Sequence, residues 1–104
     1  MKIRISHQSL RLRLSPKDLD LIASANLLRE TLQTGPESFL DFQLLLQDQA
    51  PPHPLEQVEQ TVYVRLSKAT WKIWATGPNI EWNWDLQNPT LHLSIEKDLK
   101  PARN

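Results

Sequence analysis

Four basic side chains near the N-terminus have the residue types and spacing best suited to chemistry in this sequence. They are Lys2, Arg4, Arg11 and Arg13. They alternate with aliphatic residues in the segments 2–5 and 10–14, and alternation with a period of two is typical of half-buried strands. A four-residue hairpin loop over 6–9 would join the two strands; the alternative is one continuous strand with a bulge. All four cations, named here the basic quartet, would then project from one face of a sheet.

In that hairpin Lys2 lies opposite Arg13 and Arg4 lies opposite Arg11. Like charges directly opposite on neighbouring strands are unfavourable, so something acidic must offset them. A phosphate or polyanionic ligand is one candidate. Neighbouring carboxylates are the other, and we favour them because charged outward faces of antiparallel sheets are ordinary. The acids available for this pairing are Asp41, Glu81, Asp85 and Glu96.

Four tryptophans in the second half of the chain offer another possible binding surface, because aromatic rings stack on bases and sugars. Trp71 and Trp74, however, fall on the apolar side of an expected helix. Trp82 and Trp84 share a strand face with Ile80. Packing of the helix on the sheet would make these rings part of the core. If only one helix covers that face, Trp84, near the strand end, is the ring that would remain exposed as a contact for a partner.

Signals for catalysis or metal binding are weak. The histidines show no metal-binding spacing, and we expect each at the surface; they are His7, His53 and His92. Glu96 and Asp98 share strand parity and would form, with Asp85, a weak candidate cation site. The chain has no cysteine and only two glycines, which excludes thiolate chemistry and glycine-rich phosphate loops. No cofactor is predicted, and an enzyme is the least favoured class.

The same alternation predicts the elements that must position these side chains. Further strands are expected at 27–33, 39–46, 61–66, 80–86 and 91–95. Ser15-Pro16 predicts the start of one helix, and Ser67 predicts the start of a second helix that continues to about Thr76. The predicted class is therefore α+β: a mostly antiparallel sheet with two short helices on one face.

The order of elements repeats within the chain. Arg13-Leu14-Ser15 and Arg65-Leu66-Ser67 each open a β-α-β-β series, and Leu40-Asp41-Phe42 matches Leu91-His92-Leu93 in the last strand of each. Two such units could share one core as a pseudo-twofold pair, although short strands also resemble one another by chance. If the repeat is real, Arg65 corresponds to Arg13 and is a fifth candidate for the anion-binding set.

The predicted domain organisation follows from this repeat. A chain of 104 residues fits one domain. Half-repeats at 10–47 and 61–98 would be joined by the proline-rich segment 48–60, and the first strand would be an addition at the N-terminus.

Four short segments spread over the chain form a recognisable pattern. They are residues 1–5 (MKIRI), residues 9–15 (SLRLRLS), Trp74 and residues 96–98 (EKD). In these segments the chain resembles the DUF7009-like family of small uncharacterised bacterial proteins. The resemblance implies a stand-alone domain of unknown function, and it brings no activity or site residue with it. The chain departs from the family pattern at His7-Gln8, in the first loop, where members tend to have glycine.

Charge and hydropathy restrict the function further. Lys+Arg and Asp+Glu each total 12, and a dedicated nucleic-acid binder usually has a basic excess. No apolar run approaches the length of a membrane span and no signal peptide is recognised, so cytoplasmic residence without membrane contact is predicted. The leading hypothesis is a small non-catalytic protein-binding or adaptor module. The alternatives are an anion- or nucleic-acid-binding domain that uses the basic strand face and, last, a metal-dependent enzyme.

Overall fold

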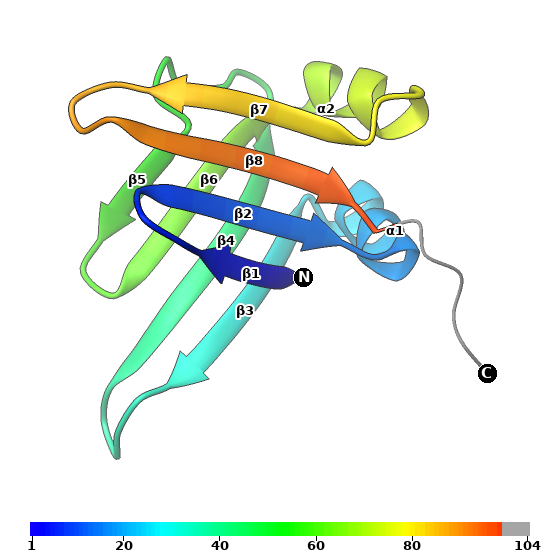
Figure 1. The fold of residues 1–104 in the computed structure, drawn as a ribbon. Helices are drawn as coiled ribbons and strands as arrows, with labels where there is room; N and C mark the ends of the chain where they lie inside the picture. The colour runs from blue at the N-terminus through cyan, green and yellow to red at the C-terminus, as the bar shows by residue number, and fades with distance from the viewer. Residues whose placement is uncertain (99–104) are drawn as a thin grey trace.

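The computed structural model describes residues 1–98, which form eight strands and two helices (Figure 1). The helices are α1 (Pro16–Ala25) and α2 (Lys68–Thr76). The strands are β1 (Lys2–Ile5), β2 (Ser9–Leu14), β3 (Leu27–Gln33), β4 (Phe39–Gln47), β5 (Leu55–Val58), β6 (Thr61–Ser67), β7 (Glu81–Leu86) and β8 (Leu91–Lys97).

Both helices begin where the sequence predicts. The Ser15 hydroxyl accepts a hydrogen bond from the Asp18 backbone N–H at 3.1 Å, and the Asp18 carboxylate accepts one from the Ser15 N–H at 3.0 Å. This reciprocal capping satisfies two N–H groups that the helix itself leaves unpaired. The Ser67 hydroxyl caps α2 in the same way by accepting from the Thr70 N–H at 3.1 Å.

The strands form two four-stranded sheets. Sheet A has the order β1-β2-β8-β7, and sheet B has the order β3-β4-β6-β5. In each sheet the two outer pairs are antiparallel and the central pair is parallel. The predicted α+β class with mostly antiparallel pairing is confirmed, and the strands divide between two mixed sheets. The predicted hairpin register is confirmed as well, because Lys2 pairs with Arg13 and Arg4 pairs with Arg11.

The repeat is visible in the topology. The first four strands correspond in order to the last four, so that β1 matches β5 and β4 matches β8. Replacing every strand by its match turns the order of sheet A, β1-β2-β8-β7, into β5-β6-β4-β3, which is sheet B counted from its other edge. Each half of the chain gives one hairpin to one sheet, passes through its helix, and gives a second hairpin to the other sheet. The residue matches also agree: Arg13 corresponds to Arg65, and His92, beside Ser9, corresponds to Asp41, beside Thr61.

The segment 48–60, predicted as a linker, contains the short strand β5. Leu55 pairs with Val64 just as Ile3 pairs with Leu12, so β5 is the counterpart of β1. The N-terminal strand is therefore not an addition: each half has the order β-β-α-β-β. Pro54, immediately before β5, is buried, and its carbonyl accepts a hydrogen bond from the Arg65 N–H at 2.8 Å.

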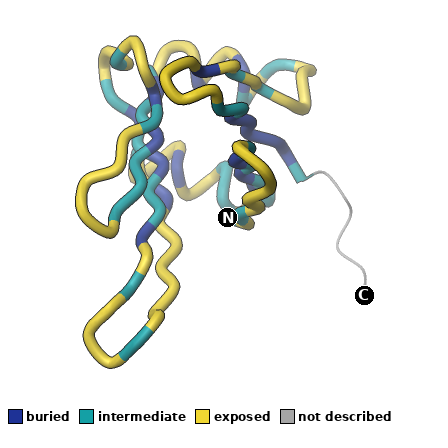
Figure 2. The backbone as a smooth tube through the Cα atoms, turned by 60° about the vertical axis from the view of Figure 1, so that its left-hand side comes forward, coloured by how far each residue is buried: buried dark blue, intermediate teal, exposed yellow. Residues whose placement is uncertain are grey.

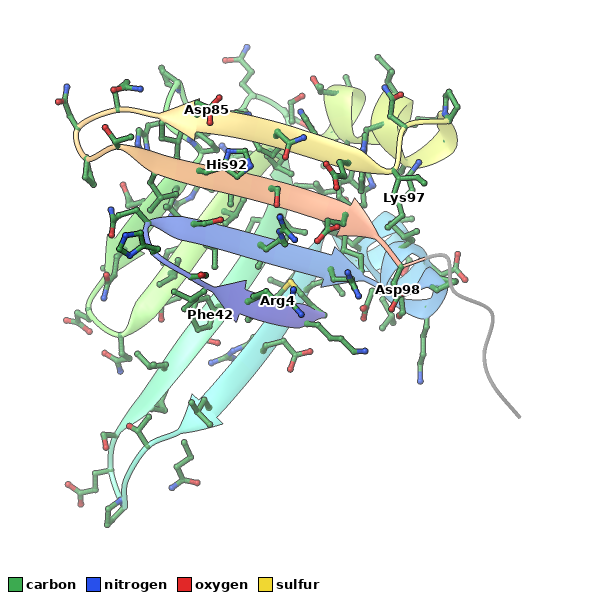
Figure 3. The ribbon with its side chains drawn as sticks, viewed as in Figure 1. Arg4, Phe42, Asp85, His92, Lys97 and Asp98 are labelled. Atoms are coloured by element: carbon green, nitrogen blue, oxygen red, sulfur yellow. The ribbon has the colours of Figure 1, made fainter. Side chains whose placement is uncertain are left out.

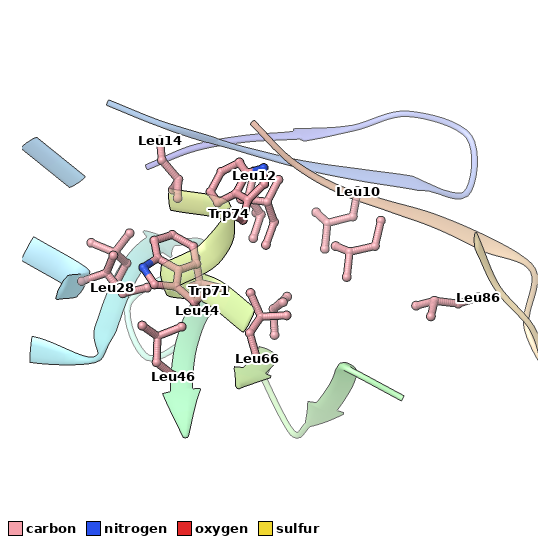
Figure 4. Packing of buried hydrophobic residues seen from close by; sticks show 14 residues of the cluster. Leu10, Leu12, Leu14, Leu28, Leu44, Leu46, Leu66, Trp71, Trp74 and Leu86 are labelled. Carbon is pink, nitrogen blue, oxygen red and sulfur yellow. The ribbon is translucent and has the colours of Figure 1, made fainter. Parts of the chain in front are cut away.

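The core lies between the two sheets, which cross face to face, and both helices lie toward the same end (Figures 1 and 2). Alternate residues of β2 and β8 point inward and meet the inward residues of β4 and β6. Trp71 and Trp74 of α2 pack among them, as Figure 4 shows, and are 4% and 7% exposed. The prediction that these two rings belong to the core is confirmed. Such burial of aromatic and aliphatic side chains is the main stabilising term for a domain of this size.

Candidate functional site

The basic quartet lies on the outward face of sheet A, opposite the leucines that form the core. Figure 3 shows Arg4 on this face of β1. Together with Glu96, the quartet lines a hollow of about 350 Å³ that is open to solvent. Arg65, in contrast, lies in β6 of sheet B and does not join the quartet. The prediction that it would do so is wrong, because each half-repeat contributes its equivalent strands to opposite sheets.

One carboxylate offsets part of the charge on this face. Glu96 of β8 lies beside Arg13, and its Oε1 is 3.7 Å from the Arg11 Nε. Within residues 1–98, Lys2, Arg4 and Arg13 form no ion pair. The expected neutralisation by neighbouring acids is therefore limited to one loose pair.

Two buried polar atoms on the same face have no hydrogen-bond partner in the described part of the chain. They are the Ser94 Oγ and the Glu96 Oε1. Ser94 is 2% exposed and lies directly beside Arg11. A buried polar atom without a partner is unfavourable and deserves a physical explanation.

The corresponding face of sheet B is arranged differently. Asp41 is buried at its centre, and its carboxylate accepts hydrogen bonds from Arg29 at 2.8 Å, Gln43 at 2.9 Å and Thr31 at 3.1 Å. Burial alone would raise the pKa of Asp41, but the hydrogen bonds from Arg29, Gln43 and Thr31 outweigh it and hold the pKa below the ordinary value. Arg65 binds Glu56 at 3.0 Å and stacks over Tyr63 at 4.5 Å. The charges of this face are satisfied by one another.

A second surface is apolar and lies along the free edge of β1. A groove of about 350 Å³ runs between this edge and the hairpin of β3 and β4. Its apolar lining residues are Met1, Ile3, Ile5, Leu32, Leu40 and Phe42. Three of them expose large side chains: Ile5 is 68%, Leu32 60% and Leu40 39% exposed. The lower end of the β3–β4 hairpin extends past sheet A in Figure 1.

Sequence reasoning missed this groove. Leu32 and Leu40 alternate like core residues, and the pattern does not say which part of a strand another sheet covers. The repeat makes the exposure clear, because Leu86 occupies in β7 the position that Leu32 occupies in β3. Leu86 is 8% exposed, whereas Leu32 is 60% exposed. A position that is buried in one half of the repeat is thus open in the other.

The free edge of β1 carries unpaired backbone groups. Ser6 N–H donates to the Ser9 carbonyl at 3.0 Å, which makes these two residues the hydrogen-bonded pair that closes the hairpin. Hydrogen-bonded and non-hydrogen-bonded pairs alternate along an antiparallel ladder. Ile3 and Ile5 are therefore in non-hydrogen-bonded pairs and direct their N–H and C=O groups away from β2.

The start of β1 is fixed at the end of this groove. The Met1 amine lies 2.9 Å from the Asp18 carboxylate of α1 and 3.1 Å from the Glu30 carboxylate of β3. Burial alone would lower the pKa of this amine, but the hydrogen bonds to Asp18 and Glu30 outweigh it and raise the pKa above the ordinary value. These contacts hold one end of the free edge in place.

The other candidate residues lie elsewhere. Trp84 is half-buried on the inward face of β7, with its ring centroid 4.6 Å from that of Trp82. His92 binds Asp85 at 2.8 Å on the outward face of sheet A (Figure 3). Asp85 pairs with His92 near the start of β8 and Asp98 follows its end, so the suggested cation site does not assemble. Among residues 1–98, no group of three or more potential metal ligands converges.

The comparisons with known proteins give a family and no activity. None of the described helices is long and apolar enough to cross a membrane. No curated protein and no solved structure matches the chain. Two of the residues that carry the family resemblance touch in the fold, since the Lys97 ammonium lies 4.9 Å from the Trp74 ring centroid and donates to the Gly77 carbonyl at 2.8 Å. The model of the DUF7009 family, a family of unknown function, matches residues 1–103, and the chain therefore belongs to that family.

Proposed function

We propose that this protein is a non-catalytic peptide-binding module that takes up an extended segment of another protein along the free edge of β1. The observation that carries the proposal is the coincidence of an open strand edge with an apolar groove directly beside it. An added strand gains affinity from backbone hydrogen bonds and specificity from alternate side chains. Trp84 is half-buried on the other edge of sheet A and is not among the residues that line this groove.

The backbone of β1 supports this mode of binding. Its outward N–H and C=O groups at Ile3 and Ile5 form no hydrogen bond with any described element. Unpaired groups of this kind are a template for another strand, and many proteins protect such edges. Beside this edge lies the groove, whose lining includes the apolar side chains of Ile5, Leu32 and Leu40.

The two faces of the added strand would meet different chemistry. Its inward side chains would face the groove, where Ile5, Leu32 and Leu40 expose apolar area. Its outward side chains would lie beside Lys2 and Arg4 of the basic quartet. Since alternate residues of a strand point to opposite faces, the best partner is a segment in which apolar and acidic residues alternate.

A second copy of this chain is a poorer occupant of the same edge. Two β1 strands paired side by side would bring Lys2 and Arg4 of both copies together on one face, and like charges across strands are unfavourable. We therefore assign the edge to a different, acidic protein segment. Cytoplasmic residence, expected from the sequence, belongs to this proposal.

The test is a selection of binding peptides from a displayed random library on the intact protein. We expect the selected peptides to alternate apolar and acidic residues and to protect the Ile3 and Ile5 amides from hydrogen exchange. Leu32→Asp should abolish their binding. Ile73→Asp is the matched control, because Ile73 is 74% exposed on α2, away from the groove.

The proposal has clear contrary outcomes. Peptides that bind Leu32→Asp as well as the wild type, or protection that appears elsewhere than β1, would overturn it. Concentration-dependent dimerisation that Leu32→Asp abolishes would show instead that the edge serves a second copy. A circular dichroism spectrum unchanged by Leu32→Asp would confirm that loss of binding is not loss of fold.

A further inference from the structure

We infer that the outward face of sheet A holds an anion site, in which the basic quartet binds a ligand bearing phosphate groups; Lys2 and Arg4 of this site also border the peptide edge. This inference does not depend on the peptide edge. It is carried by two observations: within residues 1–98, Lys2, Arg4 and Arg13 form no ion pair, and all four members of the quartet line one hollow.

The quartet has the geometry of a compact oxyanion site. Its members form two directly opposed pairs, Arg4 with Arg11 and Lys2 with Arg13, two residues apart along the strands. Strand spacing of about 4.8 Å and a rise of about 3.4 Å per residue place their Cα atoms at the corners of a rectangle of about 5 by 7 Å. Side chains from all four corners can reach one ligand in the hollow of about 350 Å³ that they line.

The described acids near the hollow compensate the charge of the quartet only in part. Glu96 is the carboxylate that lines the hollow, and its 3.7 Å contact with Arg11 is longer than a hydrogen bond. Glu81, the next acid across the sheet, lies beyond Glu96 on β7, on the side away from the quartet. An anion in the hollow would relieve the repulsion between the opposed cations, which the described residues leave largely uncompensated.

Phosphate is the anion class that fits best. Arginine presents a planar fork of donors that binds phosphate oxygens in pairs, and this site has three arginines. Single-stranded nucleic acids also use aromatic rings on which bases stack. The described residues of this face offer no phenylalanine, tyrosine or tryptophan on which a base could stack, which favours a ligand held through its phosphate oxygens.

The experiment is a titration of the intact protein with pyrophosphate, followed by amide NMR, against sodium chloride at matched ionic strength. We expect saturable shifts at Arg11, Arg13 and Ser94. Arg4→Gln and Arg13→Gln should each weaken binding by about tenfold. Arg65→Gln is the matched control, because Arg65 is the counterpart of Arg13 on sheet B, and it should leave binding unchanged.

Further arms separate the alternatives. Inorganic phosphate should bind more weakly than pyrophosphate, since it meets fewer of the four cations. Shifts that chloride reproduces, or binding that survives Arg4→Gln combined with Arg13→Gln, would overturn the inference. Binding of a single-stranded oligonucleotide without binding of pyrophosphate would replace it with a nucleic-acid surface. Leu32→Asp should retain full pyrophosphate binding, so failure of the peptide proposal and failure of the anion proposal are distinguishable.

Discussion

The outward faces of the two sheets occupy equivalent positions in the repeat, yet they treat charge in opposite ways. The positions of the basic quartet on sheet A correspond on sheet B to Pro54, Glu56, Tyr63 and Arg65. Arg65 is the one cation at these four positions, and it binds Glu56. The buried Asp41 of the same face accepts hydrogen bonds from Arg29, Thr31 and Gln43. One architecture thus carries one face whose charges pair with one another and one face whose cations are mostly without ion pairs within residues 1–98. Both of our proposals place function where the side chains of the two halves differ.

The largest effect is expected where the two halves are still alike, in the shared core. Leu14 and Leu66 are equivalent and are 0% and 2% exposed. Leu14→Ala and Leu66→Ala should each lower the free energy of unfolding by about 2–5 kcal/mol, in a single transition. Urea denaturation monitored by circular dichroism and by tryptophan fluorescence measures both quantities.

Leu21→Ala on the exposed side of α1 is the control and should change the free energy of unfolding by less than about 0.5 kcal/mol. Two separate unfolding transitions in either core variant would contradict a core that both halves share.

A smaller and one-sided effect is expected at Asp41 and its counterpart His92. Asp41→Ala would leave the donors Arg29, Thr31 and Gln43 without their acceptor and should lower the free energy of unfolding by about 1–3 kcal/mol. His92→Ala removes only an exposed pair with Asp85 and should have an effect below about 0.5 kcal/mol. If Asp41→Ala and His92→Ala lowered the free energy of unfolding equally, the two outward faces would not differ in how far their own charges stabilise the fold.

The pH dependence sharpens the same comparison. Because the pKa of folded Asp41 lies below its ordinary value, the carboxylate stabilises the fold fully above the unfolded pKa. This stability is lost as the pH falls below about 4 and through the folded pKa. Asp41→Asn should therefore reduce the slope of stability against pH in that range, measured by urea denaturation at successive pH values. If Asp41→Asn left the slope unchanged, the Asp41 carboxylate would not be a source of the stability that is lost in acid.

The smallest effect is a difference of sign between Arg4 and Arg65. Without phosphate, Arg4→Thr removes a like charge opposite Arg11 and should raise the free energy of unfolding by about 0.2–1 kcal/mol. Arg65→Thr removes the pair with Glu56 and should lower it by a similar amount. Denaturation at low ionic strength measures both changes, and added salt should reduce them.

With saturating pyrophosphate, the wild type should be more stable than Arg4→Thr. A ligand stabilises the folded state in proportion to its affinity, and the variant binds pyrophosphate more weakly. If Arg4→Thr and Arg65→Thr both lowered the free energy of unfolding at low salt, the protein itself would already neutralise the basic quartet.

The sequence predicted local structure well, because local structure depends on neighbouring residues. Alternation predicted the strands and the hairpin register, and Ser15 and Ser67 predicted both helix starts. It did not predict the parallel pairing of β2 with β8, which depends on contacts between distant segments. This pairing decides that Arg65 and Arg13 lie on different sheets.

Two further misses have physical causes. The strand β5 has four residues after a run of prolines, so its pattern is too short to show alternation. The groove was not predicted because Leu32 and Leu86 are both leucines on the apolar face of a strand, and the sequence does not show that another sheet covers Leu86 and leaves Leu32 exposed. Of the candidate site, the quartet was predicted residue by residue, whereas its loose pairing with Glu96 and the unsatisfied Ser94 required coordinates.

The order of the strands has a consequence for biosynthesis. Sheet B consists of β3 to β6, which follow one another along the chain, whereas sheet A joins the first two strands to the last two. A nascent chain leaving the ribosome can complete sheet B while β1 and β2 still await β8. Such long-range closure is slow and leaves strand edges open to wrong partners meanwhile. The outward face of sheet A therefore exists only after Leu91–Lys97 has emerged, so it forms after sheet B.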